Sequence, residues 1–375
     1  MRQIFILFSV FLLTFTMPAY AQGINTSAKQ AIVIDYETGT VLMAKNADQQ
    51  MPTSSMSKVM TMYMVFEALK SGNLSLKDSL SVSEKAWRMG GSKMFVEVDK
   101  RVQVEDLVRG VIVQSGNDAT IVLAEGLAGT EEAFAEAITQ KAQEIGMENS
   151  NFKNASGWPD PEHYSTAEDL ATLGAALIRN FPEYYKYYAE KEFTFNNIKQ
   201  ANRNPLLYRG IGADGIKTGH TEAGGYGLIG SGTENGRRVV LVINGLEDAR
   251  ARAEESTKLL EWGLKRFENK TLAKAGETLT EAEVTMGQAK SVGLTTQDDL
   301  KLTLPKLAGK NLKIAVKYDG PLIAPIKQGQ QIGTLEIHAP GMAAVTRPVY
   351  AASDVAALGI FAKTIEKAKR FIAGS

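Results

Sequence analysis

Hydrophobic positions recur with two different periods along residues 1–267. Short runs rich in β-branched residues flank turn residues at 31–44, and again at 226–232 and 237–243, which predicts two β-hairpins. The second turn contains Asn235-Gly236, a strong hairpin signal. Helical spacing of apolar residues is found in the segments 57–69, 104–113, 119–127, 131–145, 166–178 and 253–267. Strands at both ends with helices between them predict a layered α+β fold in which helices cover one antiparallel sheet.

The pattern changes after residue 267. Residues 271–350 form a series of short β-rich runs separated by Gly, Asp, Lys and Pro, which predicts a small all-β domain of sandwich type. Residues 354–375 return to helical spacing, with an apolar face and a largely basic opposite face. The apolar face carries Leu358, Phe361, Ile365, Ala368 and Ile372, and the basic one Lys363, Lys367 and Arg370. Such an amphipathic helix suits either an anionic membrane surface or packing on its own protein.

The first 21 residues carry the features of a secretory signal peptide. Arg2 is followed by an apolar run at 4–17 and by Ala19-Tyr20-Ala21, the small-x-small pattern of a cleavage site. The apolar run is short for a membrane span. We therefore expect cleavage after Ala21 and a protein that works outside the cytoplasm. The predicted parts are a signal peptide (1–21), a helix-and-sheet domain (22–267), a β domain (268–352) and a terminal helix (353–375).

Composition excludes several classes of chemistry. The 375 residues include 42 Lys+Arg and 42 Asp+Glu, and this balance argues against binding to nucleic acid. With no cysteine, the chain has no disulfides, zinc fingers, iron–sulfur clusters or thiol catalysis. The three histidines (His163, His220 and His338) are scattered, which argues against a histidine metal site. We expect no metal and no cofactor, and a serine as the nucleophile of any hydrolysis.

The sequence offers two serines that a lysine could activate. A lysine three residues after a serine on a helix shares its face, so Ser-x-x-Lys brings hydroxyl and amine together. The pattern occurs twice, at Ser55–Lys58 and at Ser150–Lys153. Because about two occurrences are expected by chance, the motif alone is weak evidence. Ser55 opens a predicted helix, whose dipole favours developing negative charge, whereas Ser150 falls in a loop rich in Asn, Gly and Pro. The context favours Ser55.

Two further motifs can complete a site. Ser-x-Asn occurs at 71–73, where Gly72 most simply ends a helix, and at Ser115-Gly116-Asn117, between predicted helices. Lys217-Thr218-Gly219 occurs once, ahead of the second hairpin. Gly219 and the pair Gly224-Gly225 would let a ligand approach the backbone of an edge strand closely.

Ser-x-x-Lys, Ser-x-Asn and Lys-Thr-Gly in this order resemble the penicillin-recognising serine enzymes. The flanking residues narrow the resemblance to low-molecular-mass penicillin-binding proteins that are D-alanyl-D-alanine carboxypeptidases. These flanks are 52–61 (PTSSMSKVMT), 115–119 (SGNDA), 163–167 (HYSTA) and 214–221 (DGIKTGHT). The resemblance covers nearly the whole chain and implies a β-lactamase/transpeptidase-like catalytic domain, a β-rich second domain and a C-terminal amphipathic membrane anchor. One departure is Ser54, because alanine more usually precedes the nucleophile.

The resemblance also implies a role for each motif residue. Ser55 would attack the D-Ala-D-Ala bond, and Lys58 would be its general base, kept neutral by burial or by a cation such as Lys217. Ser115 would relay the proton to the leaving amine, and Asn117 would hold the substrate amide and position Lys58.

The remaining candidates are implied to bind the substrate. The Lys217-Thr218-Gly219 strand would face the terminal carboxylate, and the N–H groups of Ser55 and His220 would form the oxyanion hole. The role of the His220 side chain stays open. Arg203 and Arg252 match arginines of the carboxypeptidases, and the alternative for each is a structural ion pair.

The predicted function is therefore a serine D-Ala-D-Ala carboxypeptidase that acts on peptidoglycan pentapeptides and is inhibited by β-lactams. It would lie in the periplasm, held on the outer face of the cytoplasmic membrane by its terminal helix. One alternative is a β-lactamase, although no Glu-x-x-x-Asn signature lies between residues 146 and 180. Others are a D,D-endopeptidase with the same residues and a non-catalytic peptidoglycan-binding protein.

Overall fold

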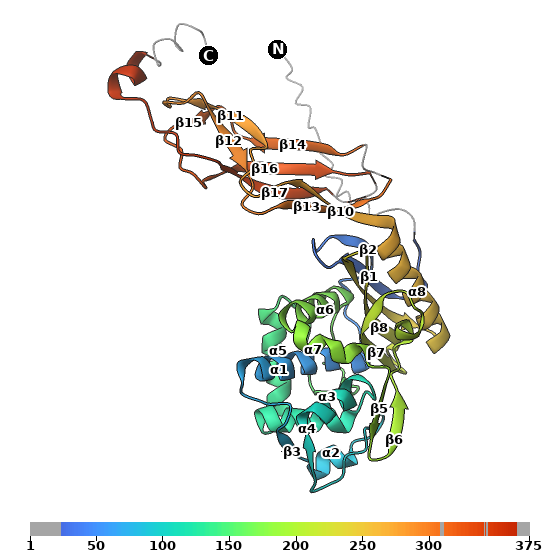
Figure 1. Cartoon of the computed structure of the whole chain (residues 1–375). Helices are drawn as coiled ribbons and strands as arrows, with labels where there is room; N and C mark the ends of the chain where they lie inside the picture. Colours follow the sequence, from blue (N-terminus) through green and yellow to red (C-terminus); the bar gives the residue numbers. More distant parts are fainter. Residues whose placement is uncertain (1–23, 308–310, 341, 343, 366–375) are drawn as a thin grey trace, which may run out of the picture. The chain divides into compact units, whose positions relative to one another are not determined.

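The computed structural model describes residues 24–307, 311–340, 342 and 344–365 (Figure 1). The predicted signal peptide and the part of the predicted terminal helix after residue 365 lie outside these residues. The chain divides into two compact units. The first lies within Gly23–Glu277 and Asp298–Gly309, and the second includes Thr278–Gln297 and the residues after 309.

A five-stranded antiparallel sheet forms the centre of the first unit, in the order β2-β1-β9-β8-β7. Its strands are β1 (Gln30–Asp35), β2 (Val41–Lys45), β7 (Ala213–Thr221), β8 (Gly225–Glu234) and β9 (Arg237–Leu246). Both predicted hairpins are confirmed as β1–β2 and β8–β9. Asn235 (φ 52°) and Gly236 (φ 78°) make the β8–β9 turn with the positive φ angles that a two-residue hairpin turn requires.

Eight helices accompany this sheet in the described residues. They are α1 (Lys58–Ser71), α2 (Glu84–Arg88), α3 (Val104–Ile112), α4 (Asn117–Ala128), α5 (Glu131–Glu144), α6 (Ala167–Asn180), α7 (Pro182–Tyr185) and α8 (Ala249–Arg266). The six predicted helices are confirmed as α1, α3, α4, α5, α6 and α8. The short elements were not predicted: α2, α7, the ribbon of β3 (Ser79–Ser81) with β4 (Arg101–Gln103), and that of β5 (Glu192–Phe195) with β6 (Ile198–Ala201).

Both faces of the central sheet are buried. On one face, Ile32 and Val240 join the core formed with helices α1 to α6, and on the other Val33 and Leu241 pack with Leu260 of α8. Figure 1 shows α8 and the other helices on opposite sides of the sheet. Because neighbouring residues of β1 and β9 face different cores, these strands read as continuous apolar runs rather than as an alternation.

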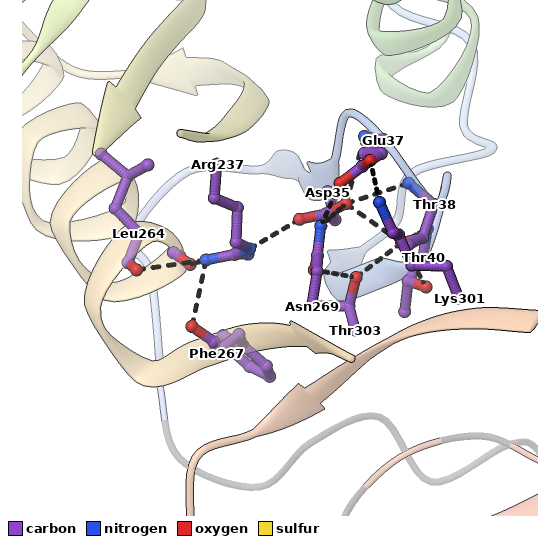
Figure 2. A network of polar contacts seen from close by, with 11 residues as sticks. Asp35, Glu37, Thr38, Thr40, Arg237, Leu264, Phe267, Asn269, Lys301 and Thr303 are labelled. Carbon is purple, nitrogen blue, oxygen red and sulfur yellow. Dashed lines mark hydrogen bonds and ion pairs between the residues drawn. The ribbon is translucent and has the colours of Figure 1, made fainter. Parts of the chain in front are cut away.

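A buried ion pair joins β1, β9 and the end of α8 (Figure 2). Arg237 Nε donates to Asp35 Oδ2 at 2.7 Å, and Asp35 has no exposed surface. Nη1 of the same arginine donates to the carbonyls of Gly263 and Leu264, which end α8. Asn269 Nδ2 donates to Asp35 Oδ1 at 3.2 Å. Asn269 belongs to β10 (Phe267–Ala273), which pairs with β13 (Leu300–Pro305) within the same unit.

The second unit is a six-stranded sheet in the order β14-β16-β17-β12-β11-β15. Its strands are β11 (Thr280–Thr285), β12 (Ser291–Thr295), β14 (Lys313–Tyr318), β15 (Leu322–Ile323), β16 (Gln331–His338) and β17 (Val345–Ala351). Neighbours are antiparallel except for β11 and β15. The predicted all-β character of this region is therefore confirmed.

The predicted start of the terminal helix is wrong. Val355 and Ala357 form bridges with Ile326 and Gly287, and the Leu358 N–H donates to the Met286 carbonyl, so this stretch is extended. Within the described residues, the helix covers 360–365. Val355 is buried and Ala356 is exposed, an alternation typical of an extended segment. The helical spacing of Leu358 with Phe361 is therefore coincidental.

Candidate active site

The Ser55–Lys58 pair lies where a short 3₁₀ turn, η1 (Ser54–Ser57), leads into α1. The Lys58 side chain is fully buried, and its Nζ donates to Ser55 Oγ at 2.8 Å. It also donates to Asn117 Oδ1 at 2.7 Å and to the Ser156 carbonyl at 2.7 Å. Three acceptors fix the amine beside the hydroxyl. A neutral amine keeps the bonds to Asn117 and Ser156 and accepts the Ser55 O–H with its lone pair.

Burial lowers the pKa of Lys58 from 10.5 to about 7. The positive charge of Arg203 lowers this pKa further, whereas Asp118 raises it. Lys58 can therefore be neutral near physiological pH, as a general base for serine must be. Burial, which the sequence suggested, is the main cause of the shift. Arg203 adds to it, and Lys217, the cation that the sequence suggested, interacts with Lys58 through the mutual repulsion of their charges.

Ser115 and Asn117 are presented by the tight connection between α3 and α4. Ser115 has a φ of 59°, a strained value for a residue with a side chain, and it is almost fully buried. Lys217 Nζ donates to Ser115 Oγ at 3.0 Å. Asn117 Nδ2 donates to the Gly90 carbonyl at 2.9 Å, so its amide is held from both sides. The three predicted motifs thus meet through two lysine side chains.

Four basic side chains, those of Lys58, Lys217, Arg203 and Arg252, surround this meeting point. Lys217 is buried, and burial together with the charges of Lys58, Arg203 and Arg252 holds its pKa well below the usual value. Arg203 donates to Ser92 Oγ at 2.5 Å, and Arg252 lies over the ring of Tyr226. Neither arginine forms an ion pair with an acidic residue in the part of the chain that the structure describes. Arg203 is exposed whereas Arg252 is buried, and a buried positive charge that no acidic side chain balances within the described residues indicates an anionic ligand.

The Lys-Thr-Gly motif lies on β7, the edge strand of the sheet. A Cβ at Gly219 would lie 2.8 Å from the Thr53 carbonyl and 3.2 Å from the Ser54 Cβ. The glycine is therefore required by the chain's own turn before α1, which contains Ser54 and Ser55, and not by a ligand as the sequence suggested. Thr218 is buried, and the next motif residue, His220, is exposed, with its ring 3.9 Å from that of Tyr226.

A cavity of about 300 Å³ opens onto Ser55. Its lining includes Ser55, Ser92, Asn117, Trp158 and His220. A neighbouring cavity of about 470 Å³ shares Trp158 and reaches the segment before the nucleophile. The two cavities therefore leave space for a ligand between Ser55, Trp158 and the end of β7.

Some site residues were missed by sequence reasoning. Asp118 is fully buried and accepts the N–H groups of Met94 and Phe95, which fixes the loop that carries Ser92. Its position directly after Ser115-Gly116-Asn117 was the available signal. Ser156 contributes only its carbonyl to Lys58, and no side-chain pattern can reveal that.

His163 was also missed as part of the site. Its Nδ1 accepts the Lys153 N–H at 3.2 Å, so a neutral ring donates from Nε2 to Ser57 Oγ, 2.7 Å away. Burial lowers the pKa of His163 to about 4, and Lys58 lowers it further while Asp160 opposes the change. The neutral ring therefore supports the turn between Ser55 and Lys58.

The competing motifs do not form sites. Ser150 Oγ donates to Asp169 Oδ2 at 2.6 Å, and Lys153 pairs with Glu162. Gly72 ends α1 with a φ of 78°, as expected for a helix stop.

The site lies between a sheet and a helical layer. It contains a buried amine hydrogen-bonded to a serine hydroxyl, a second lysine–serine pair and an edge strand that carries basic residues. These features define an acyl-transferring serine hydrolase. Comparisons with known proteins agree with this class. Residues 16–247 match the D-alanyl-D-alanine carboxypeptidase family, and residues 267–357 match the C-terminal domain of penicillin-binding protein 5. The chain therefore belongs to the D-alanyl-D-alanine carboxypeptidase family and is a serine-type hydrolase, as its three motifs predicted.

Individual relatives support this membership. The carboxypeptidase DacA of Haemophilus influenzae is 41% identical over 90% of this chain and 87% of its own length. The crystal structure of penicillin-binding protein 5 from the same species has a TM-score of 0.81 and 40% identity, covering 89% of this chain and 99% of that one. Penicillin-binding protein D2 of Listeria monocytogenes, in its ampicillin-bound form, has a TM-score of 0.59 and 32% identity, covering 64% of this chain and 98% of that one. The β-lactamase/transpeptidase-like fold is thus confirmed, and the alternative functions are not favoured.

Proposed function

We propose that this chain removes the terminal D-alanine from peptidoglycan pentapeptide stems, with Ser55 as nucleophile and Lys58 as general base. The observation that carries the proposal is the buried Lys58 amine, 2.8 Å from Ser55 Oγ and with a pKa of about 7. A neutral amine at this distance takes the hydroxyl proton while Oγ attacks the carbonyl of the penultimate D-alanine. The N–H groups of Ser55 and His220 bind the oxyanion that forms.

Ser115 completes the acylation step in this proposal. It passes its proton to the amine of the departing D-alanine and recovers one from the protonated Lys58, so that Lys58 is neutral again before the next step. Its bond with Lys217 keeps its hydroxyl oriented. The acyl group stays on Ser55 as an ester. Water, deprotonated by Lys58, then attacks this ester, releases the shortened peptide and returns the proton to Ser55. Asn117 holds Lys58 in place through both steps.

The basic residues on and beside β7 select substrates by their C-terminal carboxylate. A peptide that ends in D-alanine carries a free carboxylate, and Lys217, Thr218, Arg203 and Arg252 offer donors on and beside β7. The absence of an acidic partner for either arginine within the described residues supports this role. Guanidinium groups bind carboxylates with two parallel hydrogen bonds, which adds geometric selectivity.

Acylation by benzylpenicillin, followed by intact-protein mass spectrometry, tests the proposal. We expect residues 22–375 to gain one whole penicillin and the Ser55→Ala variant to gain none. Ser150→Ala, which removes the serine of the second Ser-x-x-Lys pattern, is the matched control and must acylate like the wild type. An adduct that persists in Ser55→Ala, or none in the wild type, would overturn the assignment. Adduct lifetime and hydrolysis of cross-linked peptides then separate a carboxypeptidase from a β-lactamase and an endopeptidase.

The proposal places the enzyme in the periplasm, on the outer face of the cytoplasmic membrane. None of the helices in the described part of the chain is long and apolar enough to span a membrane. Ile360 and Phe361 are 84% and 90% exposed, and lysines and an arginine follow them in the sequence, which suits contact with anionic lipid. Truncation after Leu358 should release the protein from membranes without loss of activity, and a truncated protein that still sediments with membranes would contradict the anchor.

A further inference from the structure

Ser54, the residue before the nucleophile, is held in an unusual backbone conformation. Its φ is 51°, in the left-handed region that residues with a Cβ rarely adopt, and the residue is 5% exposed. A Cβ at Gly157 would lie 1.8 Å from the Ser54 carbonyl oxygen, so a glycine is essential there for the close approach. A Cβ at Gly219 of β7 would lie 3.2 Å from the Ser54 Cβ. Neighbouring backbone therefore encloses Ser54 and maintains its strained conformation.

Among the residues that the structure describes, the Ser54 hydroxyl has one hydrogen-bond partner, at the end of β7. Ser54 Oγ and Thr221 Oγ1 are 2.9 Å apart. Thr221 Oγ1 also accepts the N–H of Gly224 at 3.0 Å, in the turn between β7 and β8. A Cβ at Gly224 would lie 3.1 Å from the Pro52 carbonyl, so this turn sits directly against the segment before the nucleophile. The hydroxyl pair thus joins two segments that are 167 residues apart in the sequence.

We propose that the Ser54–Thr221 hydroxyl pair sets the spacing of the oxyanion hole. Ser54 directly precedes Ser55, and Thr221 directly follows His220, so the pair ties together the neighbours of both N–H donors. This inference rests on the proposed function, in which those two N–H groups bind the developing oxyanion. Neither hydroxyl touches the reacting atoms, and both residues are positioning residues.

The physical reason is the steep dependence of oxyanion stabilisation on donor geometry. Two N–H groups stabilise the tetrahedral intermediate only when both lie within hydrogen-bond distance of the same oxygen. One of them opens a turn before α1, and the other lies near the end of an edge strand that has no further strand beyond it. Packing at Gly219 keeps these segments in contact, and in this chain the directional Ser54–Thr221 hydrogen bond adds a constraint on their relative position along the strand.

The variants Ser54→Ala, Thr221→Val and the double variant test this role. Ser54→Ala keeps the Cβ that packs on Gly219 and removes only the hydroxyl. Acylation by benzylpenicillin gives the acylation rate constant and the dissociation constant of the preceding complex separately. We expect each single variant to lower the rate constant about three- to tenfold, with the dissociation constant within about twofold of wild type. The double variant should be no slower than Thr221→Val alone, because both changes remove one interaction.

Two controls separate positioning from general destabilisation. Thr221→Ser keeps the hydroxyl and should restore the wild-type rate. Ser150→Ala removes a buried, hydrogen-bonded hydroxyl elsewhere in the same unit and should lower the melting temperature without slowing acylation. A wild-type rate in Ser54→Ala, or additive losses in the double variant, would overturn the tether while leaving the proposed function intact. Failure of the wild type itself to acylate would instead remove the proposed function, and the tether with it.

Discussion

The amine nitrogen of Lys58 lies 2.8 Å from the hydroxyl oxygen of Ser55, and the lysine has no exposed surface. A charged amine is costly in such a place unless an anion compensates it. Asp118, the one acid that raises the Lys58 pKa, is itself committed to backbone N–H groups. With a pKa of about 7, the Lys58 amine is half neutral at that pH, as the proposed general base has to be.

The rate of acylation should follow the deprotonation of Lys58. It should fall about tenfold per pH unit well below pH 7 and become constant above about pH 8, because only the neutral amine accepts the Ser55 proton. Rapid-mixing kinetics with a chromogenic β-lactam from pH 5 to 9 measures this rising limb of the pH–rate profile. Arg203→Gln should move the limb to higher pH, because the Arg203 charge lowers the Lys58 pKa. Arg209→Gln, an exposed neighbour, is the control, and a limb that both variants leave in place would contradict the coupling.

The same buried lysine should make stability depend on pH. Its pKa is about 7 in the folded protein and 10.5 in the unfolded chain, so the unfolded chain binds more protons between these values. The free energy of unfolding therefore rises with pH across this window, and the penalty is fully present below pH 7. We expect Lys58→Met to be more stable than wild type by up to about 4 kcal/mol at pH 7, and by much less near pH 10. Urea unfolding at both pH values measures the difference, and a constant difference would refute the link to this group.

Arg252 should act on substrates that end in a carboxylate. Arg252→Gln is expected to lower kcat/KM for a D-Ala-D-Ala peptide about ten- to hundredfold, since a charge-assisted hydrogen bond is lost. The same peptide with an amidated C-terminus should react equally slowly with the variant and the wild type. Arg250→Gln, two residues earlier on α8, is the control, because Arg250 is exposed and paired with Glu254. Equal losses on the acid and amide peptides would mean that Arg252 supports the fold rather than the substrate.

Stability, not catalysis, should depend on the buried Asp35–Arg237 pair (Figure 2). Arg237→Leu leaves a fully buried carboxylate without its partner and removes donors from the last carbonyls of α8. We expect a loss of about 3–5 kcal/mol in the free energy of unfolding, with kcat/KM of the remaining folded protein unchanged. Lys301→Ala breaks an exposed pair with Glu37 in the same network and should leave stability near the wild-type value. Similar losses in both variants would show that burial does not distinguish the two pairs.

Local pattern was sufficient for the regular elements of the first unit. The six predicted helices and the two hairpins are present because each buries a continuous apolar face, and the Asn235-Gly236 turn admits few other conformations. The short ribbons β3–β4 and β5–β6 have three or four residues per strand, too few to show a period, and pairing between the strands forms them. The start of the terminal helix was misjudged for a related reason. Bridges from Val355 and Ala357 to the sheet override a local helical spacing.

The candidate site shows the same division between what local pattern reveals and what long-range packing decides. Motif order identified Ser55, Lys58, Ser115, Asn117 and Lys217, and the structure brings them together through hydrogen bonds. The sequence could not show that the Ser156 carbonyl and the His163–Ser57 pair support the lysine, because backbone acceptors carry no side-chain signature. Nor could it show that Gly219 accommodates the chain's own Thr53 carbonyl rather than a ligand.

The sequence by itself determined the chemistry of this protein: a serine and a lysine one helical turn apart, two supporting motifs in order, and no thiol or histidine cluster to compete with them. Only the tertiary structure decided how that chemistry is tuned. The Lys58 pKa depends on burial and on Arg203, and the Ser54–Thr221 contact depends on β7 lying against the nucleophile turn. Both are set by segments more than a hundred residues apart, which packing of the sheet and helices brings together and which local sequence does not encode.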